Sequence, residues 1–479
     1  MLRIAITALA LAFAVSGVRA ADTAAPAAAP AANAPVVQPD KIPGNWKIEP
    51  QPLPPLDEIL KRPAATLPVY GLYTWAEGYR KNRESLKQVG WRVFRLGGPF
   101  EDDDMKMFAE DGVEVMVCPS NPSKKNYKDF DSDEAFIAAY LKSIDEFLTR
   151  YGPGGTFFKD NPAAPQRPIL HCEIWNEPNF HYMIPDDKSK TRGEINAQRD
   201  ALYAKVLPAV YDAIKRKWPT VQVVGFGAGG ASKDDIRFIG NVFAKDPAHI
   251  AKSFDILSTH PYQNTPPDTY DVRAWGQYSV ASSLRAIREI MTQGGAAGKP
   301  VWYTECGWPI SKADGGEYEM DGKEETTTPL LQAAYIVRMY ALAMRLGVER
   351  VHIMHVRDIH GYNAGFFLNN GSWRPSAFAV QTIVKLMPNP KIKKAVSDGV
   401  DGYYAYECQA DGLAKESPQG LVIMAWNVAG PKTVEITVPT PKAQVVDMLG
   451  HEKTVAAKDG KITVEVGPCP VYVRALGLE

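Results

Sequence analysis

Residues 169–178 read Ile-Leu-His-Cys-Glu-Ile-Trp-Asn-Glu-Pro, a short run rich in large apolar side chains that ends in a polar cluster. A run of this length predicts a buried β-strand, and the proline predicts that a loop begins there. Apolar residues then recur at intervals of three and four, which predicts a helix containing Tyr203, Val206, Leu207, Val210, Tyr211 and Ile214. Strand, loop and helix in this order are the repeating unit of a parallel α/β fold.

The same alternation extends from this segment in both directions. We predict eight strands, at residues 67–75, 91–96, 113–118, 169–175, 221–226, 254–259, 301–304 and 350–356. Further helical segments fall at residues 80–88, 136–148, 282–291 and 330–346, and Asp131 or Ser132 is the predicted N-cap of the second. Eight parallel strands with helices between them predict a (β/α)8 TIM barrel. An open doubly wound sheet is the alternative, but no Gly-x-Gly-x-x-Gly follows the first strand.

The pattern changes at about Pro388, beyond which short β-type runs are separated by turn residues. These runs fall at residues 403–408, 421–427, 433–438, 443–448, 461–466 and 471–476. They predict a small antiparallel β-sandwich. We therefore assign residues 46–388 to the barrel and 389–479 to the C-terminal sandwich.

The N-terminus has the pattern of a cleavable signal peptide over residues 1–20. A short positive region precedes an apolar run at residues 4–15, and Val18-Arg19-Ala20 is a small-x-small cleavage site. The apolar run is too short to span a bilayer with margin, although a retained signal anchor is an alternative. Residues 21–45 are rich in Ala and Pro, which predicts a flexible tether. We expect a secreted or periplasmic protein with no membrane span after signal cleavage.

Composition limits the choice of partners. The 479 residues include 54 basic and 55 acidic side chains, a balance that argues against nucleic acid or an anionic membrane surface. The five cysteines are widely spaced and form no Cys-x-x-Cys, so we predict no metal and no cofactor. Cys408 and Cys469 are expected to form a disulfide if their strands are neighbours.

Polar residues that suit glycosidic bond cleavage stand at the ends of three predicted strands. The fourth strand ends in Trp-Asn-Glu177-Pro, the sixth in His260-Pro-Tyr262, and the seventh in Thr-Glu305-Cys-Gly-Trp308-Pro. The carboxyl ends of barrel strands meet at one mouth, where active sites lie. Cleaving a glycosidic bond requires one carboxylic acid and one carboxylate that flank the sugar. Glu177 and Glu305 are therefore the predicted catalytic pair.

These motifs resemble clan A of the glycoside hydrolases, which includes families 5, 17 and 39. The pair formed by Trp-Asn-Glu177-Pro and Thr-Glu305 carries the resemblance, over about residues 65–388. His260-x-Tyr262 is similar to family 5-like members, and Glu305-Cys-Gly-Trp308-Pro resembles the Glu-x-Gly-Trp-Pro of family 17. The resemblance implies that Glu177 is the acid/base and Glu305 the nucleophile. Arg95 resembles the arginine of the clan that bonds the nucleophile.

Further side chains are candidates for substrate binding. Asn176 is placed to bond the sugar 2-hydroxyl, and Tyr262 to donate a hydrogen bond to Glu305. His260 is either a binding residue or a hydrogen-bonded core imidazole. Trp75 and Trp308 are candidate sugar platforms. In contrast, we expect Glu173 to belong to a structural ion pair and Trp175 to pack in the core.

The eighth strand departs from the clan, many members of which carry a tryptophan at its end. Here His355 or Arg357 takes that place. An arginine would favour an acidic or substituted polysaccharide, and the alternative is that Arg357 and Asp358 form a loop ion pair.

The sequence thus predicts a retaining glycoside hydrolase that cleaves β-linkages of a polysaccharide or oligosaccharide. A non-catalytic carbohydrate-binding protein on the same barrel is an alternative, although it has no need of both glutamates. A transglycosylase is a second alternative, because it uses the same chemistry with a sugar as acceptor. The glycan, endo or exo action and the oligomeric state stay open.

Overall fold

The computed structural model describes residues 38, 53–62, 68–119, 127–263, 265–269, 279–320, 326–410 and 420–476. The predicted signal peptide lies outside the described residues, as does all of the predicted tether except Gln38. Within these ranges, no helix is long and apolar enough to cross a lipid bilayer.

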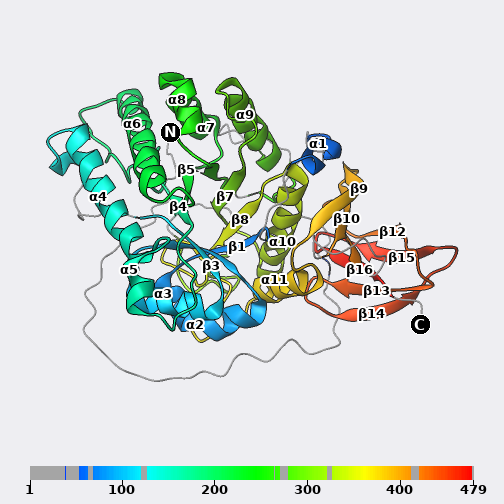
Figure 1. Cartoon of the computed structure of the whole chain (residues 1–479). Coiled ribbons are helices and arrows are strands. Elements are labelled where there is room, and N and C mark those ends of the chain that lie inside the picture. Colours follow the sequence, from blue (N-terminus) through cyan, green and yellow to red (C-terminus); the bar gives the residue numbers. More distant parts are fainter. Residues whose placement is uncertain are drawn as a thin grey trace.

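Eight parallel strands close into a barrel, in sequence order around the ring (Figure 1). Closure is complete because β1 pairs with β8 as well as with β2. The strands are β1 (Tyr70–Trp75), β2 (Val93–Gly97), β3 (Glu114–Val117), β4 (His171–Glu173), β5 (Gln222–Gly229), β6 (Ile256–His260), β7 (Val301–Cys306) and β8 (Arg350–Met354). The predicted (β/α)8 barrel is confirmed.

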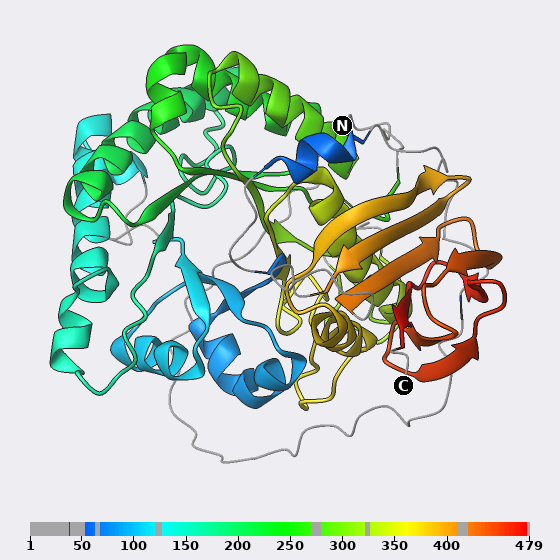
Figure 2. The same cartoon turned by 45° about the vertical axis from the view of Figure 1, so that its right-hand side comes forward.

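Helices surround the barrel, as the views in Figures 1 and 2 show. The long ones are α2 (Ala76–Val89), α3 (Asp102–Asp111), α4 (Asp133–Tyr151), α6 (Arg192–Lys217), α7 (Lys233–Lys245), α9 (Val280–Gln293), α10 (Pro329–Leu346) and α11 (Pro375–Leu386). Short helices are α1 (Leu56–Leu60), α5 (Thr156–Asp160) and α8 (Pro247–Lys252). Ser132 caps α4, since its side chain accepts a hydrogen bond from the backbone N–H of Ala135. The sequence pattern did not predict α3, whose first turn is three aspartates and hides the apolar spacing.

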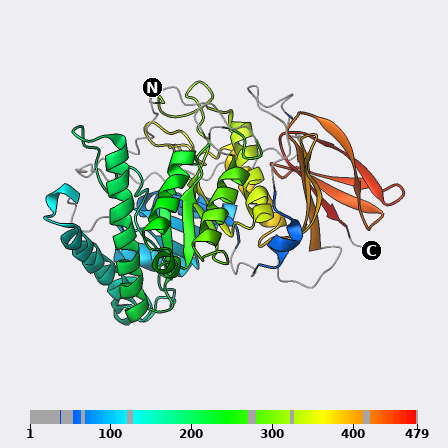
Figure 3. The same cartoon turned by 90° about the horizontal axis from the view of Figure 1, so that it is seen from above.

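An antiparallel β-sandwich lies to one side of the barrel (Figure 3). Its strands are β9 (Lys391–Val400), β10 (Tyr403–Gln409), β11 (Leu421–Asn427), β12 (Lys432–Thr437), β13 (Lys442–Asp447), β14 (Glu452–Ala456), β15 (Lys461–Val466) and β16 (Val471–Ala475). Six form a sheet in the order β14-β13-β16-β11-β10-β9, and β12 pairs with β15 in a second sheet. The edge strands β9 and β14 were not predicted, because they expose polar side chains and bury few apolar ones.

The sandwich and the barrel share one apolar core. Tyr404, Trp426 and Tyr472 of the sandwich belong to the same buried cluster as the side chains of α10 and α11. Gln38, from the predicted tether, also contacts this domain. Its side-chain amide donates to the carbonyl of Cys469 (3.0 Å) and accepts from the N–H of the same residue (2.9 Å).

All five cysteines are buried free thiols, so the predicted disulfide between Cys408 and Cys469 is wrong. Cys408 lies on β10 and Cys469 just before β16, and β11 separates these two strands in the sheet. A strand between the two positions places their side chains beyond the reach of a disulfide.

We expect all five thiols to be unreactive in the native protein and all five to react after denaturation without reductant. Burial blocks access of the reagent and raises the pKa of the thiols, as for Cys172, whose pKa rises to about 12. Titration with an aromatic disulfide reagent, with and without guanidinium, counts the thiols that react in the denatured and in the native protein. A count of three after denaturation would reveal a disulfide.

Candidate active site

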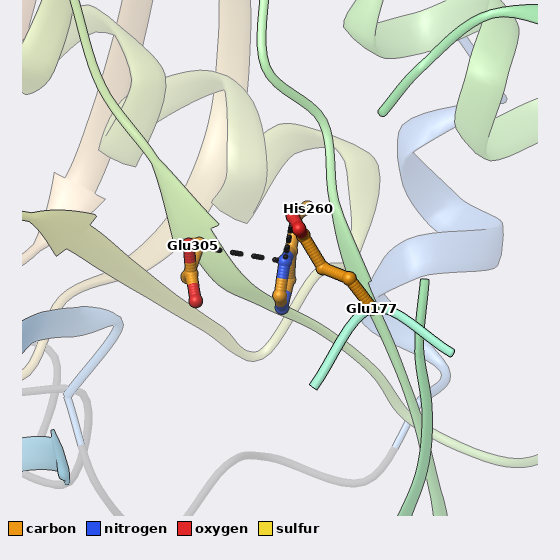
Figure 4. Close-up of side chains that lie close together, drawn as sticks. All are labelled: Glu177, His260 and Glu305. Atoms are coloured by element: carbon orange, nitrogen blue, oxygen red, sulfur yellow. Dashed lines mark hydrogen bonds and ion pairs between the residues drawn. The ribbon is translucent and has the colours of Figure 1, made fainter. Parts of the chain in front are cut away.

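Three side chains from three strands meet at the carboxyl end of the barrel (Figure 4). Glu177 follows β4, His260 ends β6, and Glu305 lies near the end of β7. The Nδ1 atom of His260 is 2.9 Å from Oε1 of Glu177 and 3.9 Å from Oε2 of Glu305. One oxygen of each carboxylate and one ring nitrogen lie within 4.8 Å of one another. The structure therefore brings together the two glutamates that the sequence singled out.

The backbone around Glu177 is held in an uncommon conformation. Trp175 and Glu177 have φ angles of 67° and 47°, in the left-handed region that costs a non-glycine residue about 1–3 kcal/mol. The N–H of Glu177 donates to the carbonyl of Gly227 at 2.9 Å, which ties this turn to β5. A Cβ on Gly229 would lie 2.6 Å from Oε1 of Glu177, so only glycine leaves room for the carboxyl group there.

Arg95, on β2, organises the other side of the site. Its side chain is 1% exposed and donates to Oε1 of Glu305 at 2.5 Å. The same guanidinium donates to Glu173 at 2.6 Å and to Oδ1 of Asn176 at 2.7 Å. One cation thus pairs with two buried carboxylates and orients the amide of Asn176.

Tyr262 completes the contacts of Glu305. Its hydroxyl donates to Oε2 at 2.9 Å and also lies 2.8 Å from the sulfur of Met354. Burial and the charge of Glu305 raise the pKa of Tyr262 well above its usual value, so the phenol keeps its proton.

The two carboxyl groups have pKa values shifted in opposite directions. Burial raises the pKa of Glu177, and the charge of Glu305 adds to that effect, although His260 opposes it. Burial acts in the same sense on Glu305, but His260 and Arg95 outweigh it, so the pKa of Glu305 is lowered. Glu177 is thereby suited to remain protonated and Glu305 to remain ionised, as an acid and a carboxylate with separate tasks require.

The histidine between them responds to both charges. Burial lowers the pKa of His260, but Glu305 and Glu177 outweigh burial and raise it above its usual value. These three residues also form a group of potential metal ligands. The guanidinium of Arg95 touches Glu305, and its positive charge disfavours a metal cation at the same point.

The remaining predicted binding residues differ in their access to a ligand. Trp75 is 38% exposed and presents an open ring at the end of β1. In contrast, Trp308 is only 2% exposed and donates its indole N–H to the carbonyl of Thr265 at 2.8 Å. Trp308 therefore packs within the wall of the site and offers no open face for a sugar.

His355 and Arg357 lie beyond the end of β8 with separate contacts. His355 is buried beside Trp75, with ring centroids 4.3 Å apart, and burial lowers its pKa to about 4. It is therefore neutral near pH 7. Arg357 donates to Oδ1 of Asn82 at 3.1 Å. Asp358 does not pair with Arg357 but receives Arg374 at 2.6 Å, which corrects the alternative of a loop ion pair.

Sequence reasoning missed three residues of this site. The guanidinium of Arg95 lies over the Tyr73 ring, 4.6 Å from its centroid. Met354 ends β8 and contacts Tyr262, at the strand end where the clan often carries tryptophan. Phe180 lies against Gly229, next to the carboxyl group of Glu177. Alternation along β1 could have identified Tyr73, because it shares a face with Gly71 and Trp75.

Solved structures share this fold. They include a family 39 glycoside hydrolase from the gut symbiont Bacteroides cellulosilyticus WH2, at 18% identity and a TM-score of 0.60, covering 86% of this chain and 81% of that one. A monomeric β-xylosidase from Caulobacter crescentus CB15 has 14% identity and a TM-score of 0.51, with 87% and 99% covered. A 4-O-α-L-rhamnosyl-β-D-glucuronidase from Fusarium oxysporum 12S has 12% identity and a TM-score of 0.55, with 90% and 99% covered.

No protein-family model and no curated protein sequence matches this chain. At identities this low, the similarity to solved structures establishes the fold alone.

Substituting Arg95 tests its importance to folding. We expect Arg95→Met to lower the free energy of unfolding by about 3–5 kcal/mol, because two buried carboxylates lose their cation. Arg150→Met is the matched control, since Arg150 pairs with two carboxylates at the surface and should lose only about 0–1 kcal/mol. Urea unfolding followed by circular dichroism measures both. Equal losses of unfolding free energy in the two variants would show that burial gives the Arg95 ion pairs no special weight in stability.

Proposed function

We propose that this protein is an exported, retaining glycoside hydrolase that cleaves β-linkages in a polysaccharide or oligosaccharide. The observation that supports this most directly is the pair of carboxyl groups at the barrel mouth, which have one oxygen each within 4.8 Å of the other and pKa values shifted in opposite directions. Retaining enzymes hold their carboxyl groups about 5–5.5 Å apart, and inverting enzymes need about 6.5–9.5 Å to admit a water. Export is inferred from residues 1–20.

In the first step, Glu305 attacks the anomeric carbon while Glu177 gives its proton to the oxygen of the leaving group. The glycosidic C–O bond breaks, an ester forms between the sugar and Glu305, and the leaving group departs as an alcohol. Arg95 and Tyr262 hold the attacking carboxylate ionised and fix its orientation. Asn176, held by Arg95, is the donor for the sugar 2-hydroxyl.

In the second step, water attacks the ester and Glu177 accepts its proton. Formation of the ester removes the negative charge of Glu305, which had contributed to raising the pKa of Glu177. The pKa of Glu177 therefore falls when the residue must change from acid to base. The product leaves with its original anomeric configuration, and both residues return to their starting protonation states.

A panel of aryl β-glycosides and polysaccharides, both neutral and acidic, tests the proposal, with Glu305→Gln as the control. We expect hydrolysis by the wild type, none by the variant, and a product that NMR shows to retain its configuration. Inversion would refute the retaining mechanism. Binding without turnover on every substrate would favour a carbohydrate-binding protein, and transfer to an added acceptor sugar would favour a transglycosylase.

Azide rescue separates the roles of the two glutamates. In Glu177→Ala, an activated aryl glycoside should still react in the first step, because its leaving group needs little of the roughly 10²–10⁴-fold help of a general acid. Azide should then release the intermediate as a glycosyl azide of retained configuration. In Glu305→Ala, azide should attack from the vacated face and invert the configuration. NMR of the two azide products checks this, and the opposite pattern would exchange the roles.

The pH dependence of kcat/KM follows from the two shifted pKa values. Activity requires Glu305 ionised and Glu177 protonated, so the profile should be bell-shaped. We expect the acid limb below the ordinary range for a glutamate and the alkaline limb above it. Tyr262→Phe removes a donor to Glu305 and should move the acid limb to higher pH, with the alkaline limb changed less. An unmoved acid limb would show that Tyr262 does not tune Glu305.

A further inference from the structure

A fully buried carboxylate lies where the barrel meets the sandwich. Asp268 is in the loop that follows β6, and its side chain is 1% exposed. Its Oδ2 accepts hydrogen bonds from Nε of Arg338 at 2.8 Å and from the indole N–H of Trp426 at 2.6 Å. Its Oδ1 accepts a further bond from Arg338. Each oxygen therefore has a charged or aromatic N–H donor.

These donors come from both domains. Arg338 belongs to α10 of the barrel and also donates to the carbonyl of Pro468 in the sandwich at 3.1 Å. Trp426 belongs to β11, and its ring stacks on Tyr404 with centroids 5.0 Å apart. The hydroxyl of Tyr404 donates to the backbone carbonyl of Asp268 at 3.3 Å. The sandwich thus holds both the side chain and the backbone of this one loop residue.

The same loop carries Tyr262, whose hydroxyl contacts Glu305. Between Tyr262 and Asp268, the side chain of Gln263 donates to the carbonyl of Pro266 at 2.9 Å. The carbonyl of Thr265 accepts from Trp308, which follows Glu305 in the chain. In the described part of the loop, Tyr262 therefore contacts the site and Asp268 contacts the sandwich.

The described part of this loop, residues 261–263 and 265–269, contains neither helix nor strand, so side-chain contacts set its position. The two-pronged pair with Arg338 fixes the Asp268 carboxylate against α10 of the barrel, in direction as well as distance. The sandwich holds the same residue through the indole N–H of Trp426 and the hydroxyl of Tyr404. We propose that Asp268 is a positioning residue, through which the C-terminal sandwich holds the loop after β6 and with it the Tyr262 hydroxyl on the nucleophile. This inference rests on the proposed function, in which Glu305 is that nucleophile.

The test compares two interdomain carboxylates in the full-length mature protein. Asp268→Asn weakens the contacts that hold the loop after β6 to Arg338 and Trp426. Asp398→Asn is the matched control, because Asp398 on β9 pairs with Arg345 of the same helix α10 at 2.8 Å but has no contact with the loop among the described residues. Trp426→Phe is a second variant, which keeps an aromatic ring beside Tyr404 but removes the indole donor and part of the ring.

The readout is the pKa of Glu305, measured by NMR of ¹³C-carboxyl-labelled glutamate and assigned with Glu305→Gln. The groups that face this carboxylate are Arg95, His260, Tyr262 and Glu177. We expect Asp268→Asn and Trp426→Phe to raise the pKa of Glu305 by about half a pH unit, because the hydrogen bond from the Tyr262 hydroxyl to Glu305 becomes weaker. Tyr262→Phe, which removes that bond, should shift the pKa in the same direction. Asp398→Asn should leave it at the wild-type value while lowering stability.

Two results would overturn the proposal. One is an unchanged pKa of Glu305 in folded Asp268→Asn and Trp426→Phe proteins, and the other is an equal rise in Asp398→Asn. If Asp268→Asn does not fold, Trp426→Phe decides alone. The NMR titration needs no substrate, so an inactive protein would refute the proposed function without deciding this inference. In an active protein, the acid limb of kcat/KM should move with the NMR titration.

Discussion

The site depends on one buried cation, the guanidinium of Arg95. From β2 it contacts two carboxylates, Glu173 at the end of β4 and Glu305 on β7, and the side-chain amide of Asn176, which follows β4. Removing an arginine from water is costly, and the cost is offset only when its donors meet well-placed acceptors. The eight-stranded barrel provides them because its strands converge on a single mouth. Once Arg95 is in place, a buried ionised Glu305 becomes tolerable.

The second glutamate lies in surroundings that favour its protonated form. Glu177 is buried and close to the negative charge of Glu305, and both conditions raise its pKa, although His260 opposes them. The glycine at position 229 permits the close approach, since any side chain would occupy the space of the carboxyl group. Two residues of one type therefore acquire different chemistry from their surroundings alone.

The sandwich domain extends this dependence beyond the barrel. At the interface, the buried carboxylate of Asp268 accepts hydrogen bonds from Arg338 of the barrel and from Trp426 of the sandwich. Because Asp268 shares its loop with Tyr262, the proposal gives the sandwich a part in orienting the nucleophile. Under that proposal, truncating the sandwich would affect the ionisation of Glu305 as well as the stability of the protein.

The sequence by itself determined the strand–helix alternation, the antiparallel C-terminal domain and the two glutamates, because apolar spacing and strand ends are local signals. The contact of Arg95 with Glu305 was expected only through the resemblance to a known clan, and the tertiary structure shows how it is formed. Arg95 and Glu305 are separated by 210 residues, and no local pattern encodes their contact. Burial of Trp308, pairing of Asp358 with Arg374 and separation of Cys408 from Cys469 by β11 likewise follow from packing. Packing brings together segments far apart in the chain, and each segment's own residues specify only its local conformation.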